Sequence, residues 1–226
     1  KSSVAVNLAF SLKKKGFEVG LLDVDLYGPS IPLLLGVSND VVVQHDTEKN
    51  MQPVFAYGMP TMSIGYLVDE KAPAVWRGPI ASKAVQQLFY STQWGTLDYL
   101  IIDLPPGTGD IHLTLAQKLS LQGVVMVTTP QNIALADVRK AIKMFEKVNV
   151  PLLGIVENMG TYQCNHCGHT THLFGEGGGA TLAEEYHTNL LGTLPLDSKM
   201  REHSDQGKPF VLSDSESELQ KAYDDL

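Results

Sequence analysis

The stretch KSSVAVNLAFSLKKKGFEVGLLDVD (residues 1–25) decides the fold class. Val4, Leu8 and Leu12 recur at helical spacing and therefore share one face of a helix. The run that follows, EVGLLDVD (18–25), is short and apolar and ends in acids, a pattern typical of a strand buried on both faces of a parallel sheet. The sequence thus predicts a helix that leads directly into a buried strand.

Further apolar runs of the same form are spread along the chain: LDYLIID (97–103), GVVMVTT (123–129), VPLLGIVEN (150–158) and NLLGTLPLD (189–197). Residues at helical spacing also predict a helix over 133–147, namely Ile133, Leu135 or Ala136, Ile142 and Phe145. This alternation favours a doubly wound α/β fold, with a mostly parallel sheet and helices on both faces. We interpret the less regular residues 40–75 as an insertion, and 203–217 as a polar loop before a terminal helix.

Composition limits the possible classes of protein. The 226 residues are 43% hydrophobic and 19% charged, which indicates a globular chain of single-domain size. A formal net charge of −8 argues against nucleic acid or an anionic membrane as a partner. No apolar run reaches the ~18–20 residues that a bilayer span needs, and no signal peptide is visible. Two cysteines cannot form a disulfide framework, so we expect a reducing compartment such as the cytoplasm.

Chemically active side chains stand at three places where parallel strands and helices meet. Lys1 and Ser2 head the first helix, as in the last residues of a phosphate-binding loop, G-x-x-x-x-G-K-[ST]. A lysine and a serine N-cap of a surface helix would give the same letters. Asp23 and Asp25 close the first strand, where a strand-to-loop turn would also favour Asp, Gly and Pro.

The third place is IIDLPPGTGD (101–110), where an apolar run stops at Asp103 and passes into prolines and glycines. Asp103 then lies where the acid of a Walker B motif reaches Mg²⁺. Gly107 and Gly109 would let the backbone approach a γ-phosphate and change conformation when it leaves. A hydrolytic phosphate site needs a cationic cradle, Mg²⁺ ligands and a carboxylate near the attacking water, and the three places together supply all of them.

The chain resembles the Mrp/ApbC branch of the MinD-like P-loop ATPases over essentially its whole length. The matching stretches are DVDLYGPSIP, SIGYLV, VWRGPIASKA, LDYLIIDLPPGTGDIHLTLAQ, TTPQNIAL, GIVENMG, CNHCG and LPLD. In that family the loop reads K-G-G-x-G-K-[ST]. The resemblance therefore implies that residues 1–226 form a single P-loop ATPase domain that lacks its first strand and the start of its phosphate loop.

The resemblance also implies roles for the residues around the phosphates. Lys1 would contact the β- and γ-phosphates, Ser2 would bind Mg²⁺ and Ser3 would contact the α-phosphate. Asp25 would position the attacking water, and Asp23 would support the hydration shell of the metal.

Further roles follow from the same resemblance. Asp103 would be the Walker B acid, and the amide of Gly107 would donate to the γ-phosphate. Asn158 resembles the residue that reads adenine, because its amide both donates and accepts, although it could also be an Asn in a turn. Pro195, in the LPLD turn, would wall the base. Arg77 in VWRGP would lie near a dimer interface or pair with a surface acid.

A second constellation, YQCNHCGHTTHLF (162–174), lies in a loop that we expect over 160–175. Cys164 and Cys167 have the C-x-x-C spacing that puts two thiolates on one metal, although a buried thiol pair or a redox dithiol has the same spacing. His169 or His172 could complete a zinc site within one chain. Alternatively, a two-fold dimer could bring two pairs together to hold a [4Fe–4S] cluster. The family resemblance favours the bridging cluster.

The sequence therefore indicates an ATP-hydrolysing iron–sulfur cluster carrier. The resemblance implies a slow ATPase with ATP, Mg²⁺ and a [4Fe–4S] cluster, which serves apo iron–sulfur proteins and cluster-assembly scaffolds as a homodimer. A bacterial cytoplasm or a mitochondrial matrix would suit it. Two alternatives remain: a MinD- or ParA-like positioning ATPase, and a nucleotide-binding protein with a structural zinc knuckle. The acidic end SDSESELQKAYDDL argues against the first, because a membrane binder would carry a basic amphipathic helix.

Overall fold

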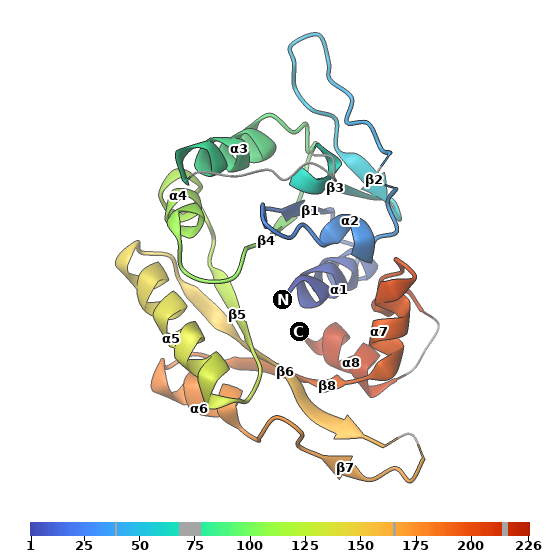
Figure 1. The fold of residues 1–226 in the computed structure, drawn as a ribbon, viewed down its shortest axis with the longest axis vertical. Helices are drawn as coiled ribbons and strands as arrows, with labels where there is room; N and C mark the ends of the chain where they lie inside the picture. The colour runs from blue at the N-terminus through green and yellow to red at the C-terminus, as the bar shows by residue number, and fades with distance from the viewer. Residues whose placement is uncertain (39, 68–77, 165, 214–216) are drawn as a thin grey trace.

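The computed structural model describes residues 1–38, 40–67, 78–164, 166–213 and 217–226, and strands alternate with helices along them (Figure 1). The helical segments are α1 (Ser2–Lys14), α2 (Ile31–Leu34), η1 (Ile64–Tyr66), α3 (Gly78–Tyr90), α4 (Asp110–Lys118), α5 (Asn132–Lys147), α6 (Gly178–Glu185), α7 (Ser198–Asp205), η2 (Phe210–Leu212) and α8 (Glu218–Asp225). The strands are β1 (Val19–Asp23), β2 (Val54–Ala56), β3 (Met59–Ser63), β4 (Tyr99–Asp103), β5 (Val124–Thr128), β6 (Leu152–Gln163), β7 (Thr170–Thr171) and β8 (Leu190–Leu196).

The described strands form two four-stranded sheets. The first has the order β2-β3-β1-β4, and in the second β6 lies between β5 and β8 and also pairs with β7. Parallel pairs join β1 to β3 and β4, and join β6 to β5 and β8. Antiparallel pairs are confined to the two short strands β2 and β7. The predicted mostly parallel α/β fold is confirmed, as are all five strands and both helices predicted from the sequence. The described strands form two sheets because β4 and β5 do not pair with each other.

Helices cover both faces of the sheets, as the doubly wound prediction requires. All of β1 is buried, with Leu21 in a core beside α1 and α8 and Leu22 in a second core beside α3 and α4. A third core lies between β5, α5 and α6. The first core contains residues of both sheets, since Leu21 of β1 shares it with Val156 of β6. Helix α1 therefore packs between the two sheets, where Figure 1 shows its start.

The helix over 133–147 has the predicted apolar face with one exception. Leu135, Ile142 and Phe145 are buried, but Ile133 is 79% exposed. Ile133 is the second residue of α5, so its side chain lies at the end of the helix and beyond the sheet that the rest of the face covers.

The interpretation of residues 40–75 as an insertion is wrong for 54–66. This segment contains β2, β3 and η1, and β3 is buried along its whole length beside β1. The sequence MPTMS hides the strand because Pro60 and Thr61 interrupt the apolar pattern. Pro60 fits here because it lies near the start of β3, ahead of the parallel ladder with β1, which begins at Thr61.

The polar-loop interpretation of 203–217 is wrong for η2. Phe210 and Val211 are buried, and the backbone of Val211 is held from two sides. Its N–H donates to Oδ1 of Asn7 at 3.0 Å, and its carbonyl accepts from Nε2 of Gln220 at 3.0 Å. The predicted terminal helix is confirmed as α8, which packs on α1 and β8. Segment η2 thus ties the start of α1 to the end of the chain.

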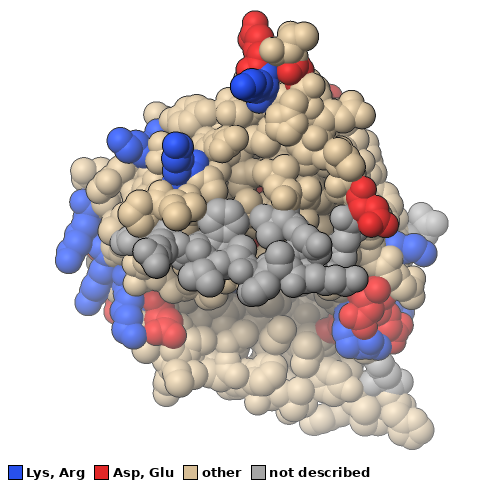
Figure 2. Space-filling model, turned by 45° about the horizontal axis from the view of Figure 1, so that its top comes forward, with Lys and Arg blue, Asp and Glu red and all other residues tan. Residues whose placement is uncertain are grey.

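Charged side chains are unevenly distributed over the face drawn in Figure 2. Lysine and arginine predominate along the left edge of this view, the top and the right edge carry side chains of both signs, and few charges lie on the described surface between them. On this face, the described residues provide no broad cationic surface of the kind that nucleic-acid-binding proteins use. Within the described ranges, every helix is too short or too polar to cross a membrane.

A close backbone approach between two turns supplies a stability prediction. Gly207 has φ +67°, and a Cβ built on it would overlap the backbone of Gly36, at the end of α2. The carbonyl of Gly207 also accepts from the hydroxyl of Tyr57 at 2.8 Å. We expect Gly207→Ala to lower the free energy of unfolding by more than about 2 kcal/mol, because backbone strain and a clash add.

The matched control is Gly95→Ala, because Gly95 has φ +72° but a Cβ built on it would meet no atom within 4 Å. Gly95→Ala should lower the free energy of unfolding only by the strain of a left-handed backbone, about 1–2 kcal/mol. Urea denaturation of both variants measures the difference. Equal losses of stability would show that the contact between Gly36 and Gly207 contributes nothing.

Candidate functional site

The carboxyl ends of β1 and β4 lie side by side. The parallel register pairs Asp23 with Asp103, and the N–H of Val24 donates to the carbonyl of Asp103 at 3.0 Å. The sequence predicted this juxtaposition, because parallel strands present their carboxyl ends at one edge of a sheet. Asp25, two residues beyond the end of β1, is half-buried beside this edge.

Asp23 is completely buried and organises the loop that follows β1. Its Oδ1 accepts from the N–H of Asp25 at 3.0 Å, and its Oδ2 accepts from the N–H of Ile31 at 3.2 Å and from Oγ of Ser63 at 3.0 Å. Burial raises the pKa of Asp23 to about 7, although these hydrogen bonds work in the opposite direction. The described contacts of Asp23 are therefore with the loop and with β3.

Asp103 is 4% exposed and only partly satisfied. The hydroxyl of Ser2 donates to its carboxylate, while Oδ2 has no hydrogen-bond partner among the described residues. Burial raises the pKa of Asp103, and the bond from Ser2 and the charge of Lys1 oppose the rise. A buried carboxylate oxygen without a donor indicates a missing partner at this position.

Lys1 and Ser3 lie at the same end of α1. Nζ of Lys1 donates to the carbonyl of Leu104 at 3.2 Å, so its ammonium lies just beyond the end of β4. Burial lowers the pKa of Lys1, and the charges of Asp103 and Asp25 oppose this effect. The carbonyl of Ser3 accepts from Nδ2 of Asn7 at 2.8 Å, which anchors the first turn of the helix.

The loop after β4 carries Gly107 and leads into α4. Gly107 is exposed and has φ +94°, a backbone conformation that favours glycine. Sequence reasoning missed His112, which is 4% exposed and contacts the carbonyl of Pro105 through Nε2 at 3.1 Å. Burial lowers the pKa of His112. The available signal was a histidine that follows Gly107 and Gly109 within a few residues. It was overlooked because its position fits the ordinary helical pattern of α4.

Asn158 and Pro195 are brought together on neighbouring strands. Asn158 pairs with Leu194, so Pro195 is one residue along β8. The expectation that Asn158 ends its strand is wrong, because β6 continues to Gln163. The strand is nevertheless irregular here, since Met159 has φ +59° and the register with β8 shifts between Asn158 and Tyr162.

The two cysteines lie at the tip of a hairpin formed by β6 and β7, which Figure 1 shows extending away from α1. The N–H of Cys164 donates to the carbonyl of His169, and the N–H of Gly168 donates to the carbonyl of Cys164, both at 2.9 Å. Hydrogen bonds from the backbone of Cys167 and His166 and from the thiol of Cys167 lower the pKa of Cys164. Thiolate character suits a metal ligand.

The histidines of this hairpin do not complete a zinc site with the cysteines. Nδ1 of His172 lies 2.9 Å from the carbonyl of Gly160, and its Nε2 lies 3.7 Å from Glu176. His169 is exposed. In the part of the chain that the structure describes, no three His, Cys, Asp or Glu side chains are grouped to hold a metal.

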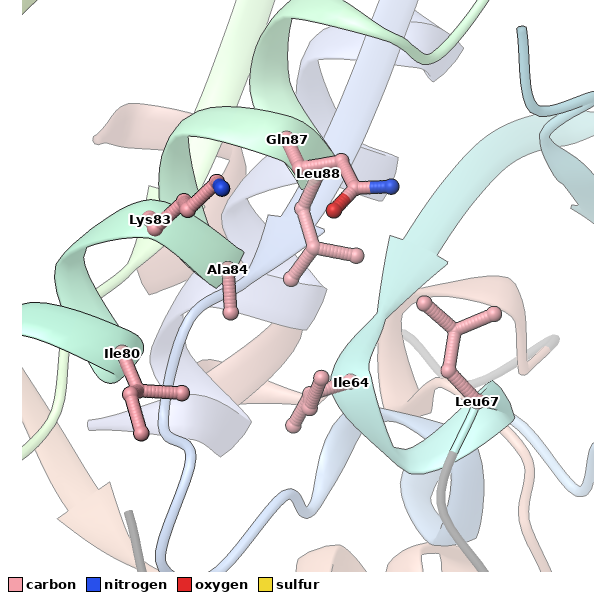
Figure 3. Close-up of a pocket in the computed structure, with 7 residues that line it drawn as sticks. All are labelled: Ile64, Leu67, Ile80, Lys83, Ala84, Gln87 and Leu88. Carbon is pink, nitrogen blue, oxygen red and sulfur yellow. The ribbon is translucent and has the colours of Figure 1, made fainter. Parts of the chain in front are cut away.

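A separate apolar pocket of about 320 Å³ lies between η1 and α3 (Figure 3). Its lining residues are Ile64, Leu67, Ile80, Lys83, Ala84, Gln87 and Leu88. None of the site residues predicted from the sequence lines it. Arg77 lies outside the described residues.

Comparisons with known proteins agree with the motifs. The family model ParA: NUBPL iron-transfer P-loop NTPase matches residues 1–226. An iron-sulfur cluster carrier protein of Escherichia coli (strain K12) is 54% identical over 226 residues, which are 100% of this chain and 61% of that protein. The iron-sulfur cluster transfer protein NUBPL of Dictyostelium discoideum is 46% identical over 226 residues, 100% of this chain and 70% of that protein. The chain thus spans less than two thirds of the E. coli relative.

Solved structures resemble the fold. A nucleotide-binding protein in complex with ADP from Archaeoglobus fulgidus has a TM-score of 0.80 and 40% identity, covering 92% of this chain and 81% of that one. The septum site-determining protein MinD complexed with Mg-ADP from Pyrococcus horikoshii has a TM-score of 0.66 and 21% identity, covering 99% and 87%. The second likeness shows the fold alone. Because the family model matches its whole length, the chain belongs to the ParA family of NUBPL-type iron-transfer P-loop NTPases.

Proposed function

We propose that this chain is the nucleotide-binding and cluster-binding part of an ATP-dependent iron–sulfur cluster carrier. The observation that carries the proposal is the pairing of Asp23 with Asp103, next to the ammonium of Lys1 and the hydroxyl of Ser2. This edge would bind and hydrolyse ATP. The Cys164/Cys167 hairpin would hold a [4Fe–4S] cluster as cargo, to be assembled or delivered to apo iron–sulfur proteins.

The geometry at the sheet edge fits a nucleotide bound with Mg²⁺. Oδ2 of Asp103 is buried and has no donor among the residues that the structure describes, and the hydroxyl of Ser2 is bonded to the same carboxylate. Mg²⁺ prefers hard oxygen ligands such as hydroxyl, carboxylate and water. Ser2 and Asp103 would hold the ion, with Asp23 supporting its water shell, and the ion would neutralise charge on the phosphates.

The chain's own residues would do the remaining work at the phosphates. Lys1 would exchange the carbonyl of Leu104 for phosphate oxygens, which it can do because Nζ is held there by one bond of 3.2 Å. Gly107 would donate its N–H to the γ-phosphate. The carboxylate of Asp25 would hold and orient the attacking water, while Ser3, Asn158 and Pro195 would contact the rest of the nucleotide.

Residues before Lys1 would complete this site. Among the described residues, β4 pairs only with β1 and β5 only with β6, and the start of α1 lies between the two sheets. We propose that a strand ahead of Lys1 fills the position between β4 and β5 and continues into the start of the phosphate loop. Residues 1–226 would then belong to a single domain, with 160–175 as its metal-binding loop.

The cluster half of the proposal needs a second subunit. One hairpin supplies two thiols, and no histidine joins them within the described residues. A [4Fe–4S] cluster takes four thiolates. A homodimer that brings two hairpins together would supply them, and a lowered pKa at Cys164 favours the ligating form.

Replacement of Asp25 tests the proposed hydrolysis. We expect Asp25→Asn to lower the rate of phosphate release by about 10²-fold or more, because a neutral amide is a weaker acceptor for the attacking water than a carboxylate and cannot take its proton. The affinity for ATP should stay within about threefold, since Asp25 would not hold the phosphates. Phosphate release and fluorescent-nucleotide titration measure the two effects.

The matched control is Asp137→Asn, which changes an exposed acid paired with Lys140 on α5. It should leave phosphate release unchanged. If Asp25→Asn also released phosphate at the wild-type rate, the proposed role of the Asp25 carboxylate would be excluded.

Replacement of both cysteines tests the cargo. Anaerobically purified protein should show broad visible absorbance and about four irons per dimer, the content of one cubane. Both signals should disappear in Cys164→Ala/Cys167→Ala and persist in His169→Ala. Zinc at about one per chain without iron or sulfide, even after reconstitution, would contradict the carrier and indicate a structural zinc knuckle.

The raised pKa of Asp23 makes stability depend on pH. Because this pKa is about 7 in the folded protein and 3.8 in a free side chain, the folded state holds a proton that the unfolded state has lost between these values. The free energy of unfolding should therefore fall as pH rises from about 4 to about 7, by up to roughly 4 kcal/mol. Asp23→Asn should flatten this slope in urea denaturation at pH 5, 6, 7 and 8. If the free energy of unfolding of Asp23→Asn fell with pH as steeply as that of the wild type, a raised pKa at Asp23 would be contradicted.

A further inference from the structure

Strand β6 joins the candidate base site to the candidate cluster site. Asn158 lies within it, and Cys164 follows its last residue, Gln163. The six residue-to-residue steps from Asn158 to Cys164 would span at most roughly 20 Å in a fully extended chain. The strand is bent between them, because Met159 has φ +59° and the register with β8 shifts after Asn158. The direction of the hairpin therefore depends on how this bend is held.

The bend is packed against the body of the protein on one side. A Cβ built on Gly160 would overlap Cγ2 of Thr193 and lie 2.8 Å from Oε1 of Glu157. The carboxylate of Glu157 is 5% exposed and accepts from the N–H of Gly179, in the first turn of α6, at 2.5 Å. Gly160 thus has little freedom to move toward β8 or α6.

His172 holds the other side of the bend. Its Nδ1 donates to the carbonyl of Gly160 at 2.9 Å, and Glu176 lies 3.7 Å from its Nε2. His172 comes directly after β7, whose ladder with β6 consists of only two pairs, Tyr162 with Thr171 and Gln163 with Thr170. The N–H of Cys164 and Nε2 of Gln163 close the hairpin near its tip, on the carbonyls of His169 and Gly168, whereas the bond from His172 ties the returning strand to Gly160 at the bend.

We propose that His172 is a positioning residue that couples the nucleotide site to the cysteines. The inference rests on the proposed function, because it requires a nucleotide at Asn158. A base held by Asn158 would restrain Met159 and with it the carbonyl of Gly160, and the bond from His172 would transmit this restraint to the hairpin. Without that bond, the two-pair ladder would let the hairpin move independently of the bend.

The reactivity of the thiols in cluster-free protein measures this coupling. Alkylation of Cys164 and Cys167 by N-ethylmaleimide is followed with and without saturating ATP and Mg²⁺, in protein that includes the residues before Lys1. A fluorescent-nucleotide titration measures ATP affinity separately. In wild-type protein we expect ATP to change the alkylation rate about fivefold or more, within the usual range of coupling between sites.

Four variants test whether the hydrogen bond from Nδ1 of His172 to the carbonyl of Gly160 is needed, or only a histidine in the hairpin. His172→Ala removes the donor, and His172→Gln places an amide nearer to the position of Nε2, so both should lose the effect of ATP on alkylation. His172→Asn places an amide near the position of Nδ1 and should retain the effect. His169→Ala, which changes an exposed histidine of the same hairpin, should also retain it.

The outcomes distinguish this inference from the function on which it rests. If wild-type protein binds ATP and the alkylation rate responds equally in His172→Ala and His172→Gln, the role of His172 is overturned. The same holds if ATP binds without any effect on wild-type alkylation. Failure of wild-type protein to bind ATP would overturn both the proposed function and this inference.

Discussion

The parallel pairing of β1 with β4 is the interaction on which the candidate site depends. It sets Asp23 beside Asp103, so two acids that are 80 positions apart in the sequence share one edge of the sheet. Such a pair is costly to bury, and it is tolerated because Asp23 accepts three hydrogen bonds and Asp103 is bonded to Ser2 beside Lys1. Oδ2 of Asp103 is buried and has no hydrogen-bond partner among the described residues, so this arrangement leaves one acceptor position open.

Helix α1 connects this edge to the rest of the molecule. Its buried residues share a core with β1 in one sheet and with β6 and β8 in the other. Asn7 joins the first turn to η2, since it donates to the carbonyl of Ser3 and accepts from Val211. The position of Lys1 and Ser2 is therefore determined by distant segments near the end of the chain, and local helical propensity alone would not hold it.

The second sheet places two chemically different candidate sites at one strand. Asn158 lies beside β8 in the sheet, whereas Cys164 lies beyond the last β6 pair in an exposed hairpin. The chain is packed more closely near Asn158 than at the hairpin tip, since Gly160 is enclosed by Thr193 and Glu157 while Cys167 is exposed. A rigid base joined to an exposed tip suits a loop that presents cargo to other proteins, because the tip can reach a partner without unfolding the sheet.

The sequence by itself determined the elements whose pattern is local: the helix over residues 2–14, the buried strands that end in Asp23 and Asp103, and the hairpin cysteines. Strand β3 and segment η2 could not be predicted, because Pro60 and the short run at Phe210 lack a periodic pattern and are defined by their neighbours. The contact of His112 with the carbonyl of Pro105 and the bond of His172 to the carbonyl of Gly160 were equally hidden, since both depend on a carbonyl brought near by folding. Local sequence thus determined which residues are candidates for the chemistry. Only the tertiary structure decided their hydrogen-bond partners, because those partners become neighbours only when the loops and strands fold.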